Sequence, residues 1–469
     1  MVDFSDETYA PADSSGAPAG ELPPYTRWLL LFQLFNGANF TVVLGVPVVL
    51  TARFLGAGES AIGVVLSLTP FLAMIQIFSY GLAERWGYRR MMLTGWTIRS
   101  FMLLFILPLP FLVGRVSEAV LVAALIAPLF AFNMVRGLAA CAWFPWLRLL
   151  IPESKRGYFL GLEQRVINGS VLATMLLSSA VLAGSPEPWR YSAVFVGSWA
   201  AGLASVFMLS RAPNRRPPAG QQRPARFRDL RASIRKVWAH RPFRRLTRFA
   251  ALYVFAQWAV PGFLVLYLRD EIQWSDSKIL ILASCMTVGV LSTSVLWGRI
   301  ADRFGSRPVM RLATLGHILV FLYWTFCSLG WLRPHPLTVG LVYIFYGSLA
   351  GGQAVAQIRS ALANCPEHDT MVGMMVYQLW ISLSAGCAPL LWGFALRALR
   401  GISTGDCATE GVCPAFTIFF VSCIGVTLVA QFLLNQVPEP RAMPAHRLLV
   451  QMVWGWPLRM LSGFTTDKR

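Results

Sequence analysis

The sequence predicts an all-α integral membrane protein whose twelve transmembrane helices form two six-helix halves. Of the 469 residues, 56% are hydrophobic and 13% are charged, whereas about 25% of residues are charged in an ordinary soluble protein. The apolar residues gather in long runs, and a strongly basic segment divides the runs into two sets of six. A bilayer core about 30 Å thick needs about 20 apolar residues per helix. Irregular backbone cannot face lipid, so each run is expected to be a helix.

Six spans are predicted in each half. The first six cover residues 27–52, 59–82, 91–113, 118–147, 158–183 and 188–210. The second six cover residues 247–269, 277–299, 308–330, 335–361, 370–397 and 414–436. We therefore expect two pseudo-symmetric bundles, 27–210 and 247–436, joined by a linker at 211–246 and followed by a cytoplasmic tail at 437–469.

Two polar segments precede the second half. Residues 1–26 are acidic and rich in Pro, Ala and Gly, and they lack the basic and apolar regions of a signal peptide, so we expect a disordered tail. Residues 211–248 contain thirteen Lys or Arg and one Asp, which accounts for twelve of the net charge of +19. Apolar residues recur there at helical spacing, which predicts an amphipathic helix on the membrane surface. They are Phe227, Leu230, Ile234, Val237 and Trp238.

The basic residues predict which loops face the cytoplasm. Short cytoplasmic loops of membrane proteins carry an excess of Lys and Arg, so the basic linker is expected inside. Both termini then lie inside too, with the basic loops at 85–90, 155–156 and 299–307. The predicted location is the cytoplasmic (inner) membrane of a bacterium. Nucleic-acid binding is set aside as a function, because a juxtamembrane position already explains the charge.

A charged loop occurs once in each half. "YGLAERWGYRR" at 80–90 and "GRIADRFGSRP" at 298–308 align at an offset of 218 residues, nearly half the chain. The aligned pairs are Glu84 with Asp302, Arg85 with Arg303, Gly87 with Gly305 and Arg89 with Arg307. A carboxylate at such a helix end can meet the positive N-terminus of another helix, and the arginines can hold the carboxylate and the turn.

Two six-helix halves, each with this loop between its second and third helices, resemble the major facilitator superfamily of transporters over residues 27–436. The family's loop has the form Gly-x-x-x-Asp-Arg-x-Gly-Arg-Arg/Lys, and the second copy departs from it at Ser306. The first copy departs further, with Tyr80 in place of the initial Gly and Glu84 in place of Asp. The resemblance implies the MFS fold and transport of a small solute.

The resemblance also implies a cytoplasmic gate. Glu84 would meet the start of the eleventh helix and Asp302 the start of the fifth, so that the two contacts close the inner end between the halves. The expected gate residues are Glu84, Arg85, Arg89, Asp302, Arg303 and Arg307. The alternative is that these charges only fix the topology. Their repetition with a carboxylate in both copies favours the gate.

Arg136 is an ionisable residue inside a predicted span. It lies about 16 Å from the inner end of the fourth helix, by the rise of 1.5 Å per residue, and it matches the family's Arg at the cavity face of that helix. Asn133, Arg136 and Trp143 share one helix face with Ala140, because they recur at helical spacing. Buried charges are usually functional, which favours contact with the substrate or the coupling ion. A structural hub that binds helix-end carbonyls is the alternative.

Glu163 is the carboxylate that lies deepest in a predicted span. It is about 8 Å from the inner end of the fifth helix, near the depth of Arg99 in the third. Arg165 is closer in sequence, but residues two apart on a helix do not face each other, so Arg99 is the expected partner. A structural Glu163–Arg99 ion pair is one hypothesis. Proton coupling is the other, because protonation would break the pair and shift the conformational balance.

Further polar residues are candidates for a solute cavity, which the first, fourth, seventh and tenth helices line in the family. They are Gln33, Asn36 and Asn39 in the first helix, Tyr253 and Gln257 in the seventh, Gln353 and Gln357 in the tenth, and Gln378 in the eleventh. For any single amide, a hydrogen bond between helices is an equal alternative to contact with a ligand.

The cysteines and the absent motifs argue against an enzyme. The eight cysteines show no metal-binding spacing, and most are expected to be small core residues. Cys407 and Cys413 share one short polar loop, where an oxidising compartment would allow a disulfide. No phosphate-binding loop, zinc spacing or Ser-His-Asp arrangement is present, so neither a cofactor nor a metal is expected.

We therefore expect a secondary active transporter that moves a small organic solute by alternating access, with protons as the candidate coupling ion. Symport or uniport is expected, since the Gly-x-x-x-Gly-Pro-x-x-Gly-Gly run of drug-proton antiporters is absent. The lipid bilayer and the solute are the expected partners, and the protein is expected to be a monomer. Amides, an arginine and aromatic residues suit a neutral or anionic solute. The alternative is a non-transporting receptor or membrane assembly factor on the same fold.

Overall fold

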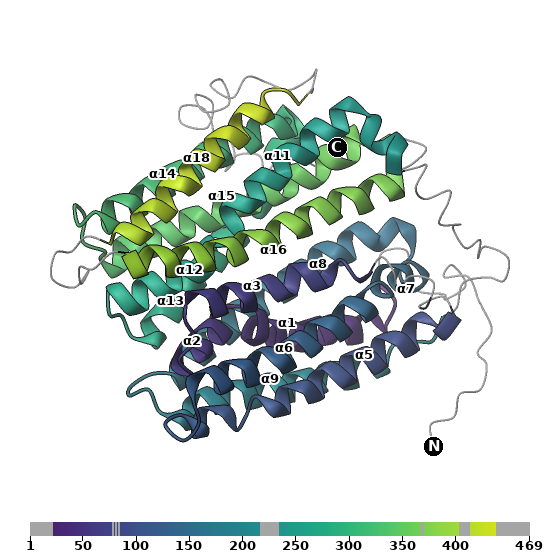
Figure 1. Cartoon of the computed structure of the whole chain (residues 1–469). Coiled ribbons are helices and arrows are strands. Elements are labelled where there is room, and N and C mark those ends of the chain that lie inside the picture. Colours follow the sequence, from purple (N-terminus) through teal and green to yellow (C-terminus); the bar gives the residue numbers. More distant parts are fainter. Residues whose placement is uncertain are drawn as a thin grey trace, which may run out of the picture.

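The computed structural model describes residues 22–76, 79, 82, 85–215, 234–366, 370–402 and 413–437. These residues form two bundles of helices, the first below the second in Figure 1. The first bundle contains α1 (Thr26–Leu44), α2 (Val46–Phe54), α3 (Glu59–Ala73), α5 (Tyr88–Met102), η2 (Leu103–Phe105), η3 (Leu109–Leu112), α6 (Glu118–Ala140), α7 (Trp143–Leu150), α8 (Glu153–Val181) and α9 (Pro188–Ser210). The second contains α11 (Arg241–Trp258), α12 (Val260–Leu266), η4 (Tyr267–Glu271), α13 (Asp276–Phe304), α14 (Ser306–Ser328), α15 (Pro336–Asn364), α16 (Thr370–Ile402) and α18 (Pro414–Leu434).

The all-α fold with twelve membrane segments is confirmed. Among the described residues, ten helical segments are long and apolar enough to cross a bilayer. The other two are α3, which is apolar but 15 residues long, and α8, which has 29 residues but carries Glu163 and Arg165. The span predicted at 59–82 continues beyond α3 into residues that are only partly described.

Two membrane segments are broken at equivalent places in the two halves. The first segment divides into α1 and α2 at Gly45, whose backbone is extended (φ −104°, ψ −157°), and the seventh divides into α11 and α12 at Ala259. Pro47 and Pro261 follow the breaks, and proline supplies no backbone N–H to continue the preceding helix. The second pieces, α2 and α12, contact each other across the two halves.

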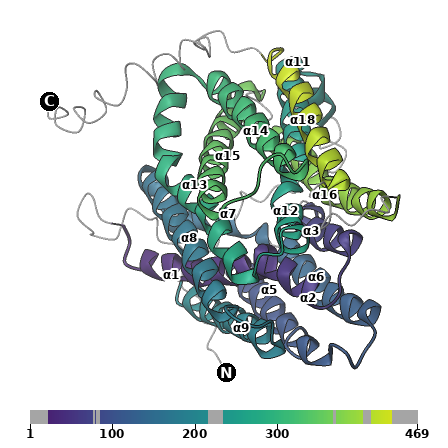
Figure 2. The ribbon, with the colours of Figure 1, turned by 90° about the vertical axis from the view of Figure 1, so that its left-hand side faces the viewer.

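The bundles meet along two pairs of helices, α3 with α16 and α8 with α13, as Figure 2 shows for α8 and α13. We call the end with the loops 55–58 and 272–275 the far end, and the end where α1 begins and α18 ends the terminal end. A large cluster of buried apolar side chains continues from the second bundle into the far-end part of the first, and a smaller cluster fills the terminal part of the first bundle. The core therefore links the halves at the far end.

Candidate functional site

Ion pairs join the two halves at the far end. Arg53 at the end of α2 pairs with Asp270, with Nη2 3.0 Å from Oδ2 and Nε 3.1 Å from Oδ1. Arg400 near the end of α16 pairs with Glu59 at the start of α3, with Nη1 2.7 Å from Oε1, and also with Glu271 of its own half. Arg400 and Glu59 have side chains 27% and 11% exposed, so water screens this contact only partly.

A second polar contact joins α8 and α9 to α13. The Tyr191 hydroxyl donates to Oδ2 of Asp276 at 2.7 Å, and Arg269 Nε lies 3.0 Å from the other oxygen of that carboxylate. The Ser179 hydroxyl lies 2.8 Å from the Ser277 hydroxyl. Each of the two helix pairs that form the interface therefore carries hydrogen bonds across the halves at this end.

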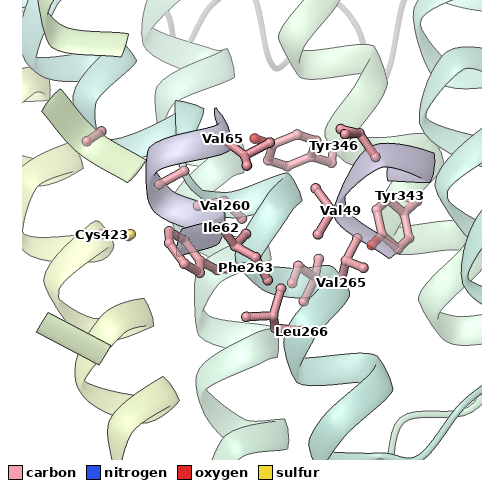
Figure 3. Close-up of a cluster of buried hydrophobic side chains, with 14 of the residues drawn as sticks. Val49, Ile62, Val65, Val260, Phe263, Val265, Leu266, Tyr343, Tyr346 and Cys423 are labelled. Carbon is pink, nitrogen blue, oxygen red and sulfur yellow. The ribbon is translucent and has the colours of Figure 1, made fainter. Parts of the chain in front are cut away.

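Apolar side chains from both halves also pack together in one cluster (Figure 3). The first half contributes Val49, Ile62 and Val65, and the second contributes Val260, Phe263, Val265, Leu266, Tyr343, Tyr346 and Cys423. The α3–α16 contact is close at Gly63, where an added Cβ would lie 2.4 Å from the Pro389 carbonyl oxygen. The far end is thus closed by a polar layer and an apolar layer together.

The terminal end differs. Each ion pair and hydrogen bond found between described residues of the two halves lies at the far end. Asp302 was expected to meet the start of the fifth helix, which is α8, but it pairs with Arg359 of its own half and its side chain is 72% exposed. The side chains of Glu153 and Ser154 at the start of α8 lie outside the described residues, so a contact of Asp302 there stays a prediction. Glu84 lies outside the described residues.

The repeated loop has a clear local role. Gly87 and Gly305 have φ of +86° and +96°, a backbone conformation that favours glycine, and each immediately precedes a helix. Arg89 then donates to the carbonyls of Ser210 and Ala212 at the end of α9, at 2.6 and 3.0 Å. Cations are stabilised at helix C-termini, where backbone carbonyls lack partners.

The second copy repeats this arrangement. Arg307 donates to the Asn435 carbonyl at the end of α18, at 2.6 Å. In both halves, the arginine at the start of the third helix therefore caps the C-terminus of the sixth. Arg303 stacks over Phe304, with Cζ 5.3 Å from the ring centroid, and Arg85 is exposed. A gating role for these residues stays a prediction.

A chain of buried polar side chains crosses the first half. Gln33 Nε2 donates to the Glu163 carboxylate, and Asn36 Nδ2 donates to Gln33 Oε1 at 3.2 Å. Arg99 Nη2 donates to Asn36 Oδ1 at 2.6 Å. The direct Glu163–Arg99 ion pair is therefore wrong for this conformation, because two amides of α1 stand between the charges. Arg165 is exposed.

Aromatic rings surround Arg99. Its side chain is fully buried, and its Cζ lies 4.5 Å from the Phe40 ring centroid, 4.3 Å from that of Trp96 and 5.2 Å from that of Phe132. Arg136 approaches the same Phe40 ring, with Cζ 5.7 Å from its centroid. The two distances to the Phe40 ring put the guanidinium carbons at most about 10 Å apart, where two unit charges at an effective dielectric constant of about 20 repel by roughly 1.7 kcal/mol. The first half thus holds two guanidinium groups close together.

Arg136 also contacts the second membrane segment. Its Nη2 donates to the Thr69 carbonyl at 3.1 Å, and the Thr69 hydroxyl donates to Asn133 Oδ1 at 3.1 Å. Trp143, expected on the same face, lies on α7 and packs against Phe32 with ring centroids 5.3 Å apart. The break between α6 and α7 separates it from the two polar residues.

Asn39 does not join the chain formed by Gln33 and Asn36. Its Nδ2 donates to the Ser198 carbonyl at 2.9 Å and lies 3.2 Å from the Ser198 hydroxyl on α9. Three residues along an α-helix turn the side chain by about 300°, so each such step moves it about 60° around the axis. Two steps from Gln33 are enough to turn Asn39 to the helix behind.

The second half places uncharged polar groups at its candidate positions. Gln257 and Gln353 are buried, and neither amide group makes a hydrogen bond to a described residue. Gln357 Oε1 accepts from the Tyr377 hydroxyl at 3.4 Å. Gln378 is exposed, with its amide nitrogen 3.4 Å from the Ser382 hydroxyl.

Tyr253 leads to a residue that sequence reasoning did not select. Its hydroxyl lies 3.3 Å from Nδ1 of His317, which is fully buried in α14 and lies 2.7 Å from the Ala313 carbonyl. The far-end pairs were also missed. The residues of these ion pairs lie at the ends of the predicted spans, where charged residues are usual. The one signal in the sequence was that several charged residues gather at the same end of the molecule.

The loop cysteines are only half described. Cys407 lies outside the described residues, so the disulfide stays a prediction. Cys413 is buried, and its backbone N–H donates to the Ser328 carbonyl at 2.7 Å.

The sequence comparison decides the family. The profile of the Major Facilitator Superfamily matches residues 29–389 and, in a second match, residues 246–454. The chain belongs to the Major Facilitator Superfamily. It is therefore an integral membrane protein with the MFS fold, as the sequence predicted. None of the curated proteins compared with the chain matches it.

Solved MFS structures share this fold at low sequence identity. A point mutant of the nucleoside transporter NupG has a TM-score of 0.68 and 14% identity, covering 88% of this chain and 100% of its own. The xylose transporter XylE from E. coli, in an inward open conformation, has a TM-score of 0.64 and 16% identity, covering 91% and 98%. A bacterial homologue of the iron transporter ferroportin, in an inward-facing state, has a TM-score of 0.65 and 13% identity, covering 88% and 98%.

Proposed function

We propose that this MFS protein is a secondary active transporter that carries a small organic solute across the cytoplasmic membrane by alternating access. The observation that carries the proposal is that, among the described residues, the two halves are held together by polar contacts at the far end. Polar pairs and apolar packing join the halves at the far end, while Asp302 at the terminal end pairs within its own half. With the terminal end in the cytoplasm, as the basic residues predict, this is an inward-facing state.

Buried or partly buried polar groups on both sides of the interface support a solute site between the halves. Arg136 and Asn133 lie in the first half, and Gln257 and Gln353 in the second. Sites at the interface of two rocking repeats are typical of secondary transporters. The transporters that share the fold differ in substrate, so their substrates do not identify this one.

A cross-link between the halves tests the proposal. Ser179→Cys with Ser277→Cys replaces two hydroxyls 2.8 Å apart on α8 and α13. Oxidation should lock the far end shut and abolish solute uptake into proteoliposomes, and reduction should restore it. Ser328→Cys with Thr417→Cys is the control, since these hydroxyls lie 2.9 Å apart within one half. Both pairs require a chain whose eight native cysteines are replaced by serine.

The outcomes separate transporter from receptor. A transporter takes up at least one solute of a broad labelled library, and only the cross-half lock stops it. A folded protein that takes up no solute, or one whose uptake survives the verified cross-half lock, would contradict alternating access. A receptor or assembly factor would then be the better description.

We further propose that Glu163 couples transport to protons. It is buried, and its hydrogen-bond partner among the described residues, Gln33, is uncharged, so a bound proton would not have to displace a salt bridge. Glu163→Gln should keep solute exchange but lose accumulation driven by a pH gradient. Retained pH-driven accumulation in a folded Glu163→Gln protein would place coupling elsewhere or show that the protein is a uniporter.

A further inference from the structure

The buried charges of the protein are unevenly divided between its halves. The first half holds Arg99 and Arg136 beside the Phe40 ring, with Glu163 at the far end of the amide chain. In the described part of the second half, the buried polar residues of the bundle interior are hydroxyls, amides and His317. A charged solute would therefore meet its counter-charge in the first half.

The two guanidinium groups are not neutralised by the side chains around them. Neither forms an ion pair with a described carboxylate. Arg99 has two buried nitrogens, Nε and Nη1, that make no hydrogen bond to a described residue, and Arg136 has one, Nε. Rings stabilise a cation through their faces, but they do not replace an acceptor for these N–H groups.

Glu163 does not compensate for both cations. Its carboxylate accepts from Gln33, and three hydrogen bonds separate it from the Arg99 guanidinium. One carboxylate beside two guanidinium groups leaves a net positive charge in a region of low dielectric constant, which is costly unless an anion binds.

The two arginines differ in access. Arg99 is fully buried, whereas Arg136 is only partly buried and donates to the Thr69 carbonyl on α3, a helix of the interface. A solute between the halves could therefore touch Arg136, with Arg99 adding positive potential from behind. Guanidinium forks match the oxygens of carboxylate and phosphate groups.

We infer that Arg136 binds the oxyanion group of the transported solute and that Arg99 acts as a positioning charge behind it, which makes the solute a small organic anion. This rests on the proposed transport function and narrows its substrate class. Gln257 and Gln353 of the second half offer donors and acceptors to the uncharged part of the same molecule.

Thermal unfolding of the purified protein tests the inference without transport. The probes are succinate with succinamide, benzoate with benzamide, gluconate with glucose, and inorganic phosphate, all at ionic strength matched with chloride. We expect at least one oxyanion to raise Tm, with no rise for its neutral partner. Comparing the rise in Tm with phosphate and with the carboxylates shows which of the two oxyanion types the site prefers. Equal shifts for a charged and a neutral partner, or no shift from any oxyanion, would overturn the inference.

Variants separate a binding role from a structural one. Arg136→Gln should weaken the stabilising oxyanion at least about tenfold, the loss expected for a charge-assisted hydrogen bond, and Arg136→Lys should retain part of the binding. Arg190→Gln removes one charge at the far end, where Arg190 donates to the Val181 carbonyl of its own half, and should bind like the wild type. If Arg136→Gln does not fold, the oxyanion affinity of Arg136→Lys and of Arg99→Lys is measured instead. An affinity unchanged from the wild type in both variants would contradict a guanidinium site.

Glu163→Gln tests the charge of the site through its oxyanion affinity, which a purely structural role of Arg136 would leave unchanged. Removing the negative charge strengthens the positive potential at Arg136, so oxyanion affinity should rise roughly threefold or more. Unchanged or weaker affinity would contradict the charge account of the site. Uptake of neutral solutes alone would also overturn the anion inference while leaving the transporter proposal standing. Oxyanion binding without any uptake would instead overturn the transporter proposal and leave the oxyanion site standing.

Discussion

Removing the Arg400 side chain should open the far end. Arg400 pairs with Glu59 across the halves and with Glu271 in its own half, so Arg400→Gln removes a cross-half contact and leaves two carboxylates without their shared cation. An exposed pair is worth at most about 1 kcal/mol, and breaking a fully buried one costs about 3–5 kcal/mol. For side chains 27% and 11% exposed, we expect about 1–2 kcal/mol, a change of about 5–30-fold in the ratio of far-end closed to open states.

Spin-label distances measure this ratio directly. Labels on Arg115→Cys and Trp331→Cys would report on exposed far-end loops of the two halves, in a chain without native cysteines. Arg400→Gln should add a population at longer distance. Arg190→Gln, which removes an arginine from the same end whose hydrogen bond to the Val181 carbonyl lies within its own half, should not. A distance distribution that Arg400→Gln leaves unchanged in folded protein would refute the assignment of this pair as a lock.

Three further predictions concern packing, helix ends and the polar loop. Gly63→Ala should also add a population with the far end open, because the new Cβ would lie 2.4 Å from a backbone carbonyl of α16. Gly161→Ala is the control, since its Cβ would meet no atom within 4 Å. Equal distance distributions for the two variants would contradict the close contact. Arg307→Gln should destabilise the end of α18 by about 0.3–1 kcal/mol. The expected signs are a lower Tm and faster amide hydrogen exchange at the end of α18, and unaltered exchange would argue against capping. Cys407, in the loop before α18, should react only with thiol reagents added from outside the cell after reduction, and labelling from the cytoplasm alone would reverse the topology.

The sequence alone determined the membrane segments and the local form of the repeated loop. Hydropathy is a property of each stretch of chain, and a lipid bilayer forces a long apolar stretch to satisfy its own backbone hydrogen bonds as a helix. The alignment of the two loops likewise paired Gly87 with Gly305, and the structure gives both a positive φ. Both results depend on neighbours in sequence, so no knowledge of the packing was needed.

Only the tertiary structure decided the partners of the polar side chains. The depths of Glu163 and Arg99 suggested a direct pair, but Gln33 and Asn36 of α1 lie between them. Arg400 and Glu59 are separated by 341 positions in the chain, and nothing in either local sequence indicates the other. Helical periodicity shows which residues share a face, but the neighbour of that face depends on how twelve helices pack and on which end of the interface is closed.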